Sequence, residues 1–258
     1  MKRKITLLGA SIVLGAGLAS AAVIADFSAE FPVSSLGGAN PYSGSETPAA
    51  GWNYMWNPNG VIGTASGYQA LAPNTVNSFP GAAGGGVSPM FTNLGNQAFS
   101  DLDPEPNGQG NFAFGRVAKT AFHPGRWGDG SLGDIRGIIA YTIQSGEAGT
   151  INIINSSFAK LTTATTSGAN GVDLDIYVND TLIGALSKDG FQSLTASNFN
   201  GSLGNLSVGD TVYVTIGNNG NDSFDASVVN FQLESIPEPS SALLGGFGVL
   251  ALLRRRRA

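Results

Sequence analysis

Apolar and polar residues alternate along the second half of the chain with the two-residue period of a β-strand. In 172–178 the even-numbered residues are all apolar, whereas the odd positions hold Asp173, Asp175 and Tyr177. Successive side chains of a strand point to opposite faces of its sheet. The alternation therefore predicts that the apolar residues face a core and that the other three face away from it.

Other segments after residue 110 are rich in β-branched and aromatic residues and have the length of short strands. They are 112–114, 138–143, 150–154, 211–216 and 226–233. Turn-forming residues separate them, and Asn179-Asp180 predicts a hairpin because both residue types tolerate a positive φ. Short strands at this spacing are typical of an antiparallel β-sandwich.

Residues 26–110 give fewer strand signals and are interrupted by clusters of Gly, Pro and Asn, such as 37–41 and 81–86. No apolar stripe with a helical period crosses either half. The predicted fold class is therefore all-β, an antiparallel β-sandwich in one ectodomain of residues 26–236, with 26–110 irregular and 111–236 strand-rich.

The N-terminal segment, 1–25, has the three parts of a secretory signal peptide. Lys2-Arg3-Lys4 is positively charged, 5–18 is an apolar helix-forming run, and Ala19-Ser20-Ala21 is a small-residue cleavage pattern. Val23-Ile24-Ala25 is a second candidate site. We expect export through the Sec translocon, cleavage by signal peptidase, and a mature chain that starts between residues 22 and 26.

The C-terminal segment, 237–258, joins a Pro-Glu-Pro tripeptide, the fourteen uncharged residues 240–253 and a block of four arginines. The uncharged residues would form about 21 Å of helix, which is short for a hydrocarbon core of about 30 Å. The positive-inside bias would keep the arginines in the cytoplasm. The segment is thus expected to be a transient membrane stop. The alternative is an ordinary anchor, with the two prolines merely ending the preceding strand.

This C-terminal order resembles the PEP-CTERM sorting signal of Gram-negative bacteria. The resemblance implies that an exosortase-type membrane peptidase recognises the signal and releases the protein outward, to the cell surface or the extracellular space. It assigns the sorting motif to Pro237, Glu238 and Pro239. It assigns the cytoplasmic basic block to Arg254, Arg255, Arg256 and Arg257.

The ectodomain also resembles a jelly-roll module of exported bacterial proteins that carry such tails. The resemblance rests on the order of 121–125, 149–153, 171–180 and 208–217, with Trp52-Asn-Tyr-Met-Trp56 as an aromatic opening. It implies a jelly-roll-like sandwich, similar in shape to non-catalytic carbohydrate-binding modules.

Between Asp26 and Glu238 the chain has six basic and eighteen acidic residues, a net charge of −12. Phosphate-rich partners require clustered Lys and Arg, so nucleic acid and anionic membrane surfaces are excluded as partners. The chain has no cysteine, which excludes disulfides and thiolate metal sites.

Catalytic signals are sparse. The single histidine, His123, lies beside Pro124 and Gly125 and is interpreted as structural. No Gly-x-Ser-x-Gly elbow is present, and zinc catalysis normally requires more than one histidine. Glycoside hydrolysis needs only two carboxylates, so a secreted glycan hydrolase stays an alternative to a non-enzymatic function. Its candidate carboxylates are Asp101, Asp103, Glu105, Asp173 and Asp175.

Calcium is the one cofactor with candidate ligands. The acidic loop 101–108 fails as an EF-hand, because Pro106 stands where the turn needs glycine and Phe112 where the bidentate acid belongs. Asp222 and Asp225 could hold a calcium ion in a turn near the sandwich edge.

Four aromatic residues are candidates for stacking against sugar rings. Trp52, Tyr54 and Trp56 alternate, so in an extended strand they point to one side and could form a platform. Core packing is the competing interpretation. Trp127 lies in a predicted loop.

The sequence as a whole predicts an exported surface protein with a non-catalytic sandwich. That sandwich is expected to bind glycan, with exopolysaccharide as a partner, or to associate with extracellular matrix. A structural biofilm or matrix component without a specific ligand is the alternative from another class.

Overall fold

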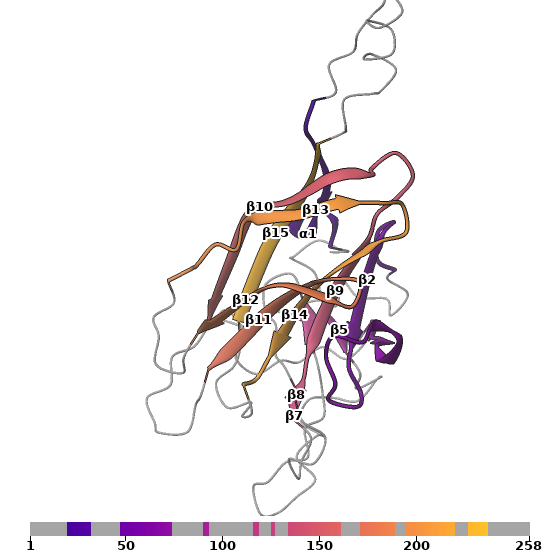
Figure 1. The fold of residues 1–258 in the computed structure, drawn as a ribbon. Coiled ribbons are helices and arrows are strands. Elements are labelled where there is room, and N and C mark those ends of the chain that lie inside the picture. The colour runs from indigo at the N-terminus through magenta and orange to yellow at the C-terminus, as the bar shows by residue number, and fades with distance from the viewer. Residues whose placement is uncertain are drawn as a thin grey trace, which may run out of the picture.

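The computed structural model describes residues 20–31, 47–73, 90–92, 116–118, 125–126, 134–160, 171–188, 195–219 and 227–236. Two antiparallel sheets dominate these residues and form a β-sandwich (Figure 1). The all-β sandwich predicted from the sequence is confirmed. The expected signal helix and C-terminal hydrophobic helix lie outside the described residues.

The smaller layer of the sandwich is a four-stranded sheet. Its strands, in spatial order, are β1 (Ala22–Asp26), β15 (Ser227–Ile236), β10 (Gly149–Lys160) and β13 (Gly201–Leu206). β10 and β15 form its centre, and their long ladder runs from Thr150↔Ile236 to Lys160↔Ser227 with one irregularity.

The larger layer is a six-stranded sheet. Its strands, in spatial order, are β12 (Thr181–Lys188), β11 (Val172–Val178), β14 (Thr211–Gly217), β9 (Gly137–Thr142), β2 (Trp52–Trp56) and β3 (Gln69–Ala70). β2 comes from the half of the chain predicted as irregular, yet it pairs with β9 along its whole length. Its Asn and Met positions lowered the strand signal, and tertiary pairing outweighs that local preference.

Two small sheets and two short helices complete the described elements. The sheets are β4 (Ala72–Pro73), β5 (Met90–Thr92) and β6 (Arg116–Ala118), and β7 (Gly125–Arg126) with β8 (Asp134–Ile135). The helices are α1 (Phe27–Glu30) and the 3₁₀ turn Ala65–Gly67. No helix in the described part of the chain is long and apolar enough to cross a bilayer.

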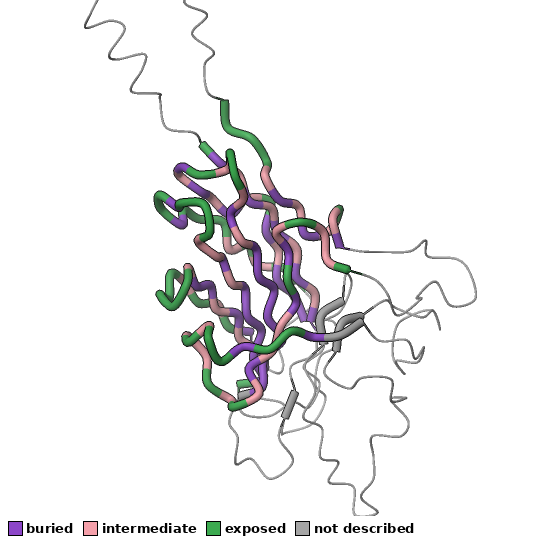
Figure 2. Tube along the Cα trace, turned by 90° about the vertical axis from the view of Figure 1, so that its right-hand side faces the viewer, coloured by how far each residue is buried: buried purple, intermediate pink, exposed green. Residues whose placement is uncertain are grey.

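The predicted alternation in β11 is confirmed. Val172, Leu174 and Ile176 belong to the core between the sheets, whereas Asp173 and Asp175 are only partly buried. Figure 2 shows where buried residues lie in the sandwich as a whole. They run through the middle of the strands, and exposed residues gather in the turns.

An aromatic cluster fills the core where the two sheets meet α1. Phe27 of α1 stacks on Phe231 of β15, with ring centroids 5.9 Å apart and planes 4° apart. Trp52 packs edge-on against both rings at 5.8 Å. Its indole Nε1 donates a hydrogen bond of 2.5 Å to Glu30 Oε2. This cluster ties β2 to α1 and to the opposite sheet.

Asp26 begins α1 and joins it to the four-stranded sheet. Its Oδ1 accepts from the Ala29 backbone N–H at 3.0 Å, and its Oδ2 accepts from Gln232 Nε2 at 2.6 Å. Burial opposes ionisation, but these hydrogen bonds and one from Ser28 outweigh it and lower the pKa of Asp26. The carboxylate is thus held as an N-cap.

Two positions show why the turns need their residues. Gly51 has φ +83°, and a Cβ there would lie 2.6 Å from Tyr141 Cε2, so only glycine fits. Asn179 has φ 52° in the hairpin between β11 and β12, which confirms the predicted turn. Its Oδ1 accepts from the Thr211 N–H at 3.0 Å, linking the hairpin to β14.

Candidate functional site

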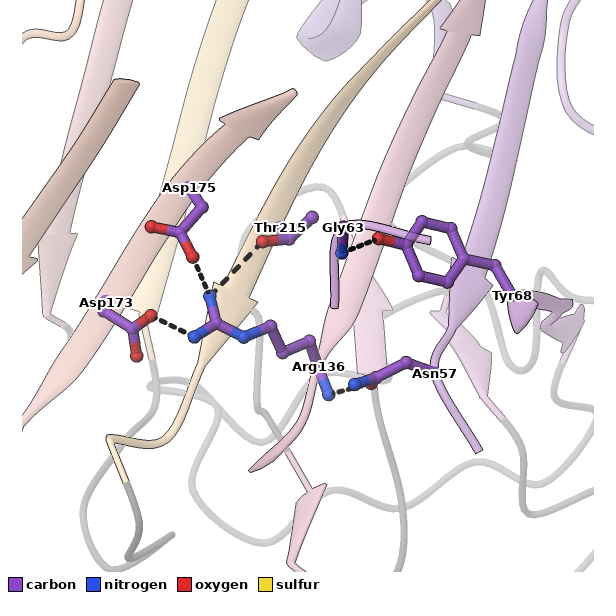
Figure 3. A network of polar contacts seen from close by, with 7 residues as sticks. All are labelled: Asn57, Gly63, Tyr68, Arg136, Asp173, Asp175 and Thr215. Carbon is purple, nitrogen blue, oxygen red and sulfur yellow. Dashed lines mark hydrogen bonds and ion pairs between the residues drawn. The ribbon is translucent and has the colours of Figure 1, made fainter. Parts of the chain in front are cut away.

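A cluster of charged and polar side chains, here called the Arg136 cluster, lies on the outer face of the six-stranded sheet (Figure 3). Arg136 sits between β8 and β9, and its side chain crosses β14 toward β11. Its Nη2 pairs with Asp173, and its Nη1 lies 2.8 Å from Asp175 Oδ2 and 3.3 Å from Thr215 Oγ1. The Arg136 side chain therefore links the start of β9 to the two adjacent strands β14 and β11.

The strand register explains why these residues meet. Asp175 of β11 pairs with Thr215 of β14, which pairs with Ile138 of β9, so the three form one row across the sheet. Asp173 lies two residues before Asp175 and thus on the same face of β11. On the other side, Asn57 Oδ1 accepts from the Arg136 backbone N–H at 2.6 Å and fixes the start of β9.

The cluster is largely withdrawn from solvent. The Arg136 side chain is 9% exposed, and those of Asp173 and Asp175 are 19% and 16% exposed. Buried charges are costly unless they are paired, and here one cation is shared by two anions. Glycoside hydrolysis needs two opposed carboxyl groups that flank an open cleft. Asp173 and Asp175 instead project side by side from one strand onto a common partner.

Three tyrosines adjoin the Arg136 cluster on the same face. Tyr177 of β11 pairs with Tyr213 of β14, and Tyr68 packs edge-on against Tyr213 with ring centroids 5.4 Å apart. Burial raises the pKa of all three hydroxyl groups. They stay protonated at neutral pH and can donate hydrogen bonds. Tyr213 is half-buried, whereas Tyr68 and Tyr177 are buried.

The segment that follows β2 folds over these tyrosines. Gly63 N–H donates to Tyr68 Oη at 2.8 Å, and the Gly63 Cα approaches the Tyr177 ring so closely that an added Cβ would lie 3.2 Å from it. The Ala65 N–H donates to Asp180 Oδ1 at 2.8 Å. These contacts hold the segment against β11 and leave Tyr213 as the partly open member of the group.

A separate apolar groove of about 230 Å³ lies between the edge strands of the two sheets. β12 and β13 form its sides, and Phe199, Leu186 and Leu203 are among its lining residues. Leu182 and Ile183 of β12 are exposed nearby.

Two of the aromatic residues predicted to stack on sugars are core residues. Trp52 is 6% exposed and Tyr54 is 0% exposed, and both belong to the cluster between the sheets. A ring with both faces packed against protein cannot stack on a ligand. The stacking interpretation is therefore wrong for Trp52 and Tyr54, and the competing interpretation of core packing is the correct one. Trp56 packs against the same core but stays partly exposed.

The other predicted site residues lie outside the described residues. They are Trp127, His123, Asp222, Asp225, Asp101, Asp103, Glu105, Pro237, Glu238, Pro239 and the block Arg254, Arg255, Arg256 and Arg257. Within the described ranges, no group of three or more His, Cys, Asp or Glu side chains could hold a metal ion.

Sequence reasoning missed Arg136 and Tyr213. The alternation in 172–178 correctly placed Asp173 and Asp175 on the outer face, but the partner of these acids follows from the register of three strands. The one available signal was that basic residues are scarce in this part of the chain, since Arg136 is one of only six between Asp26 and Glu238.

Comparison with known protein families gives one result, at the C-terminus. Residues 235–257 match the family described as the PEP-CTERM protein-sorting motif. The chain carries a PEP-CTERM sorting signal. This signal marks an exported protein that is sorted to the cell envelope or surface, with exosortase-type processing. The sequence matches none of the curated proteins.

The PEP-CTERM signal begins within the last strand of the sandwich. The matched residues start at 235, and β15 ends at Ile236, one residue before the Pro-Glu-Pro tripeptide. The signal is thus joined to the four-stranded sheet without an intervening linker.

Solved structures with some likeness to the chain include two carbohydrate-binding modules. CBM51 from Clostridium perfringens in complex with methyl-galactose has a TM-score of 0.27 and 9% identity, over 46% of this chain and 72% of that one. TmCBM61 in complex with β-1,4-galactotriose has a TM-score of 0.26 and 11% identity, over 56% and 80%. The Agl-KA catalytic domain has a TM-score of 0.24 and 18% identity, over 40% and 21%. At these TM-scores the likenesses carry no argument about ligand or activity.

Proposed function

We propose that this protein is exported, passes transiently through the inner membrane of a Gram-negative bacterium, and is released to the cell surface or the extracellular space by an exosortase-type peptidase. The PEP-CTERM signal at 235–257 is the observation that carries this proposal. Its attachment directly after β15 supports it, because a folded sandwich would then stand next to the membrane with its tail available for recognition.

We expect that replacing Pro237, Glu238 and Pro239 with alanine leaves unprocessed protein in the inner membrane. The motif distinguishes a sorting signal from an ordinary anchor, and the substitution keeps the length of the segment. Fractionation and intact mass of the full chain measure the result. The matched control replaces Ser240 and Ser241 with alanine, and it is expected to be processed normally. Normal release of the triple variant would contradict the sorting function.

For the sandwich, the proposed function is non-catalytic binding of glycan, such as the exopolysaccharide of the producing cell, or association with extracellular matrix. Tyr213 supports glycan binding, because it is a partly open ring within the same face as Asp173 and Asp175. The apolar face of a sugar can stack on such a ring, and the protonated Tyr213 hydroxyl can donate a hydrogen bond to a sugar oxygen. Trp56 and Trp127 stay candidates for stacking, and Asp222 with Asp225 for calcium.

Calorimetry of the mature protein with exopolysaccharide, with and without calcium, tests glycan binding. We expect saturable binding that Tyr213→Ala weakens about tenfold, equal to about 1.4 kcal/mol. Val208→Ala, an exposed residue in the turn before β14, is the control and should bind normally. Absence of saturable binding under both conditions would contradict glycan recognition and favour a structural matrix component. Turnover of the glycan would favour the hydrolase alternative.

A further inference from the structure

Building on the proposed export, we propose that the leader is removed by hydrolysis of the Ala21–Ala22 peptide bond, and that residues 22–26 then form the first strand of the mature sandwich. The sequence offers two cleavage patterns, Ala19-Ser20-Ala21 and Val23-Ile24-Ala25, which it does not distinguish. The fold distinguishes them, because the four residues between the two sites make up most of β1.

The backbone pairing of β1 is the first observation. Its register with β15 runs Ala22↔Ser235, Val23↔Glu234, Ala25↔Leu233 and Asp26↔Gln232. Ala22 is thus both the first residue after one candidate site and the first residue of the strand. A chain that begins at Asp26 would keep only the last of these four pairs.

The side chains of β1 give the second observation. Ala25 is 0% exposed and lies in the core, and Ile24 packs against the core from one side. The Ile24 carbonyl oxygen accepts a hydrogen bond from Tyr141 Oη of the opposite sheet at 3.1 Å. Cleavage after Ala25 would remove all three contacts and leave the Tyr141 hydroxyl with Glu147 as its described partner.

The bond between Ala21 and Ala22 has the chemistry that a signal peptidase requires. Ala19 and Ala21 are the small residues of the cleavage pattern. Ser20 and Ala21, the described residues on the leader side of this bond, are both exposed, as is Ala22, so cleavage here removes no buried residue from the described part of the chain. Water adds across the bond, which leaves a carboxylate on Ala21 and an amine on Ala22.

The position of β1 also links the two ends of the chain. β1 covers the edge of β15 as far as Ser235, two residues before the Pro-Glu-Pro tripeptide, and the start of β1 lies beside the end of β15 at one end of the sandwich (Figure 1). An unpaired strand edge is a template for association with other chains. Cleavage at Ala21 therefore keeps the strand that leads into the sorting signal paired on both sides.

The test uses the full chain, exported by a Gram-negative host, and reads the N-terminus of the mature protein by sequencing and intact mass. We expect a single N-terminus at Ala22. Ala21→Leu places a bulky residue directly before the bond and should abolish this product, whereas the matched Ala22→Leu, directly after the bond, should leave cleavage in place. An N-terminus at Asp26 in the unaltered protein would overturn the proposal.

A second variant tests whether β1 belongs to the mature fold. Deleting 22–25 from the full chain keeps the Ala19-Ser20-Ala21 pattern and yields a mature chain that starts at Asp26. We expect its melting temperature to fall by at least about 5 °C, together with faster proteolysis than the unaltered protein. An unchanged melting temperature would overturn the assignment of these residues to the mature sandwich.

Discussion

Replacing Trp52 with alanine is expected to lower the free energy of unfolding by about 3–5 kcal/mol, as is typical for a buried tryptophan. The ring is 6% exposed, lies 5.8 Å from Phe27 and Phe231, and packs edge-on against Tyr141 at 5.0 Å. The change also removes the donor to Glu30 Oε2. Denaturant unfolding of the mature protein measures the loss, and the melting temperature should fall on the order of 10 °C.

Trp56→Ala is the matched control, because it removes the same residue type from the same strand. Trp56 is partly exposed, so part of its surface already contacts water and the expected loss is about 1–2 kcal/mol. Equal losses in the two variants, or a Trp52 variant as stable as the unaltered protein, would contradict the assignment of Trp52 to the core.

The expected loss of stability in Trp52→Ala matters for any binding experiment. A Trp52 variant that no longer binds glycan would show lost folding rather than a lost contact. Tyr213 avoids the problem, because it lies on the outer face of the six-stranded sheet and is half-buried.

The positions of Trp52, Tyr54 and Trp56 in the structure show what the sequence could and could not predict. Their spacing correctly indicated one common face of a strand. It carried no information on whether that face lies inside or outside, since aromatic residues suit both. This face of β2 lies inside because β2 pairs with β9 and because Phe27 of α1 packs against Trp52. Both are long-range contacts.

β9, β10, β11, β14 and β15 were predictable because each contains a run rich in β-branched and aromatic residues, and 172–178 matched β11 residue by residue. β13 was not predicted, because its two glycines interrupt any such run. β1 was not predicted as a strand, because its residues Ala22–Asp26 were assigned to the end of the leader and its cleavage region. An apolar run can serve either purpose, and the ladder with β15 is the observation that pairs these residues with the four-stranded sheet.

The Arg136 cluster, in contrast, was not predictable from the sequence. The sequence separation is 39 residues between Arg136 and Asp175 and 79 between Arg136 and Thr215. No local pattern connects such positions, and a shift of one residue in either ladder would turn these side chains to the opposite face. The cluster is therefore a property of the register, which also makes it sensitive to substitution.

Arg136→Met is expected to destabilise the sandwich by about 3 kcal/mol, because removing one partner of a buried ion pair leaves uncompensated charge. Methionine keeps much of the apolar stem, so the loss reports mainly on the guanidinium and its contacts to Asp173, Asp175 and Thr215. Unfolding in denaturant at neutral pH measures the change.

A second variant tests whether the loss in Arg136→Met comes from uncompensated charge. Combining Arg136→Met with Asp173→Asn and Asp175→Asn removes the two anions that the substitution leaves unpaired, so the triple variant should recover most of the lost stability. The coupling between the arginine and the acids, obtained from a mutant cycle, should exceed about 1 kcal/mol. Additive losses would mean that Arg136 acts through packing alone. A recovered triple variant that still reaches the cell surface would separate the stability of the sandwich from its sorting, which depends on residues 235–257.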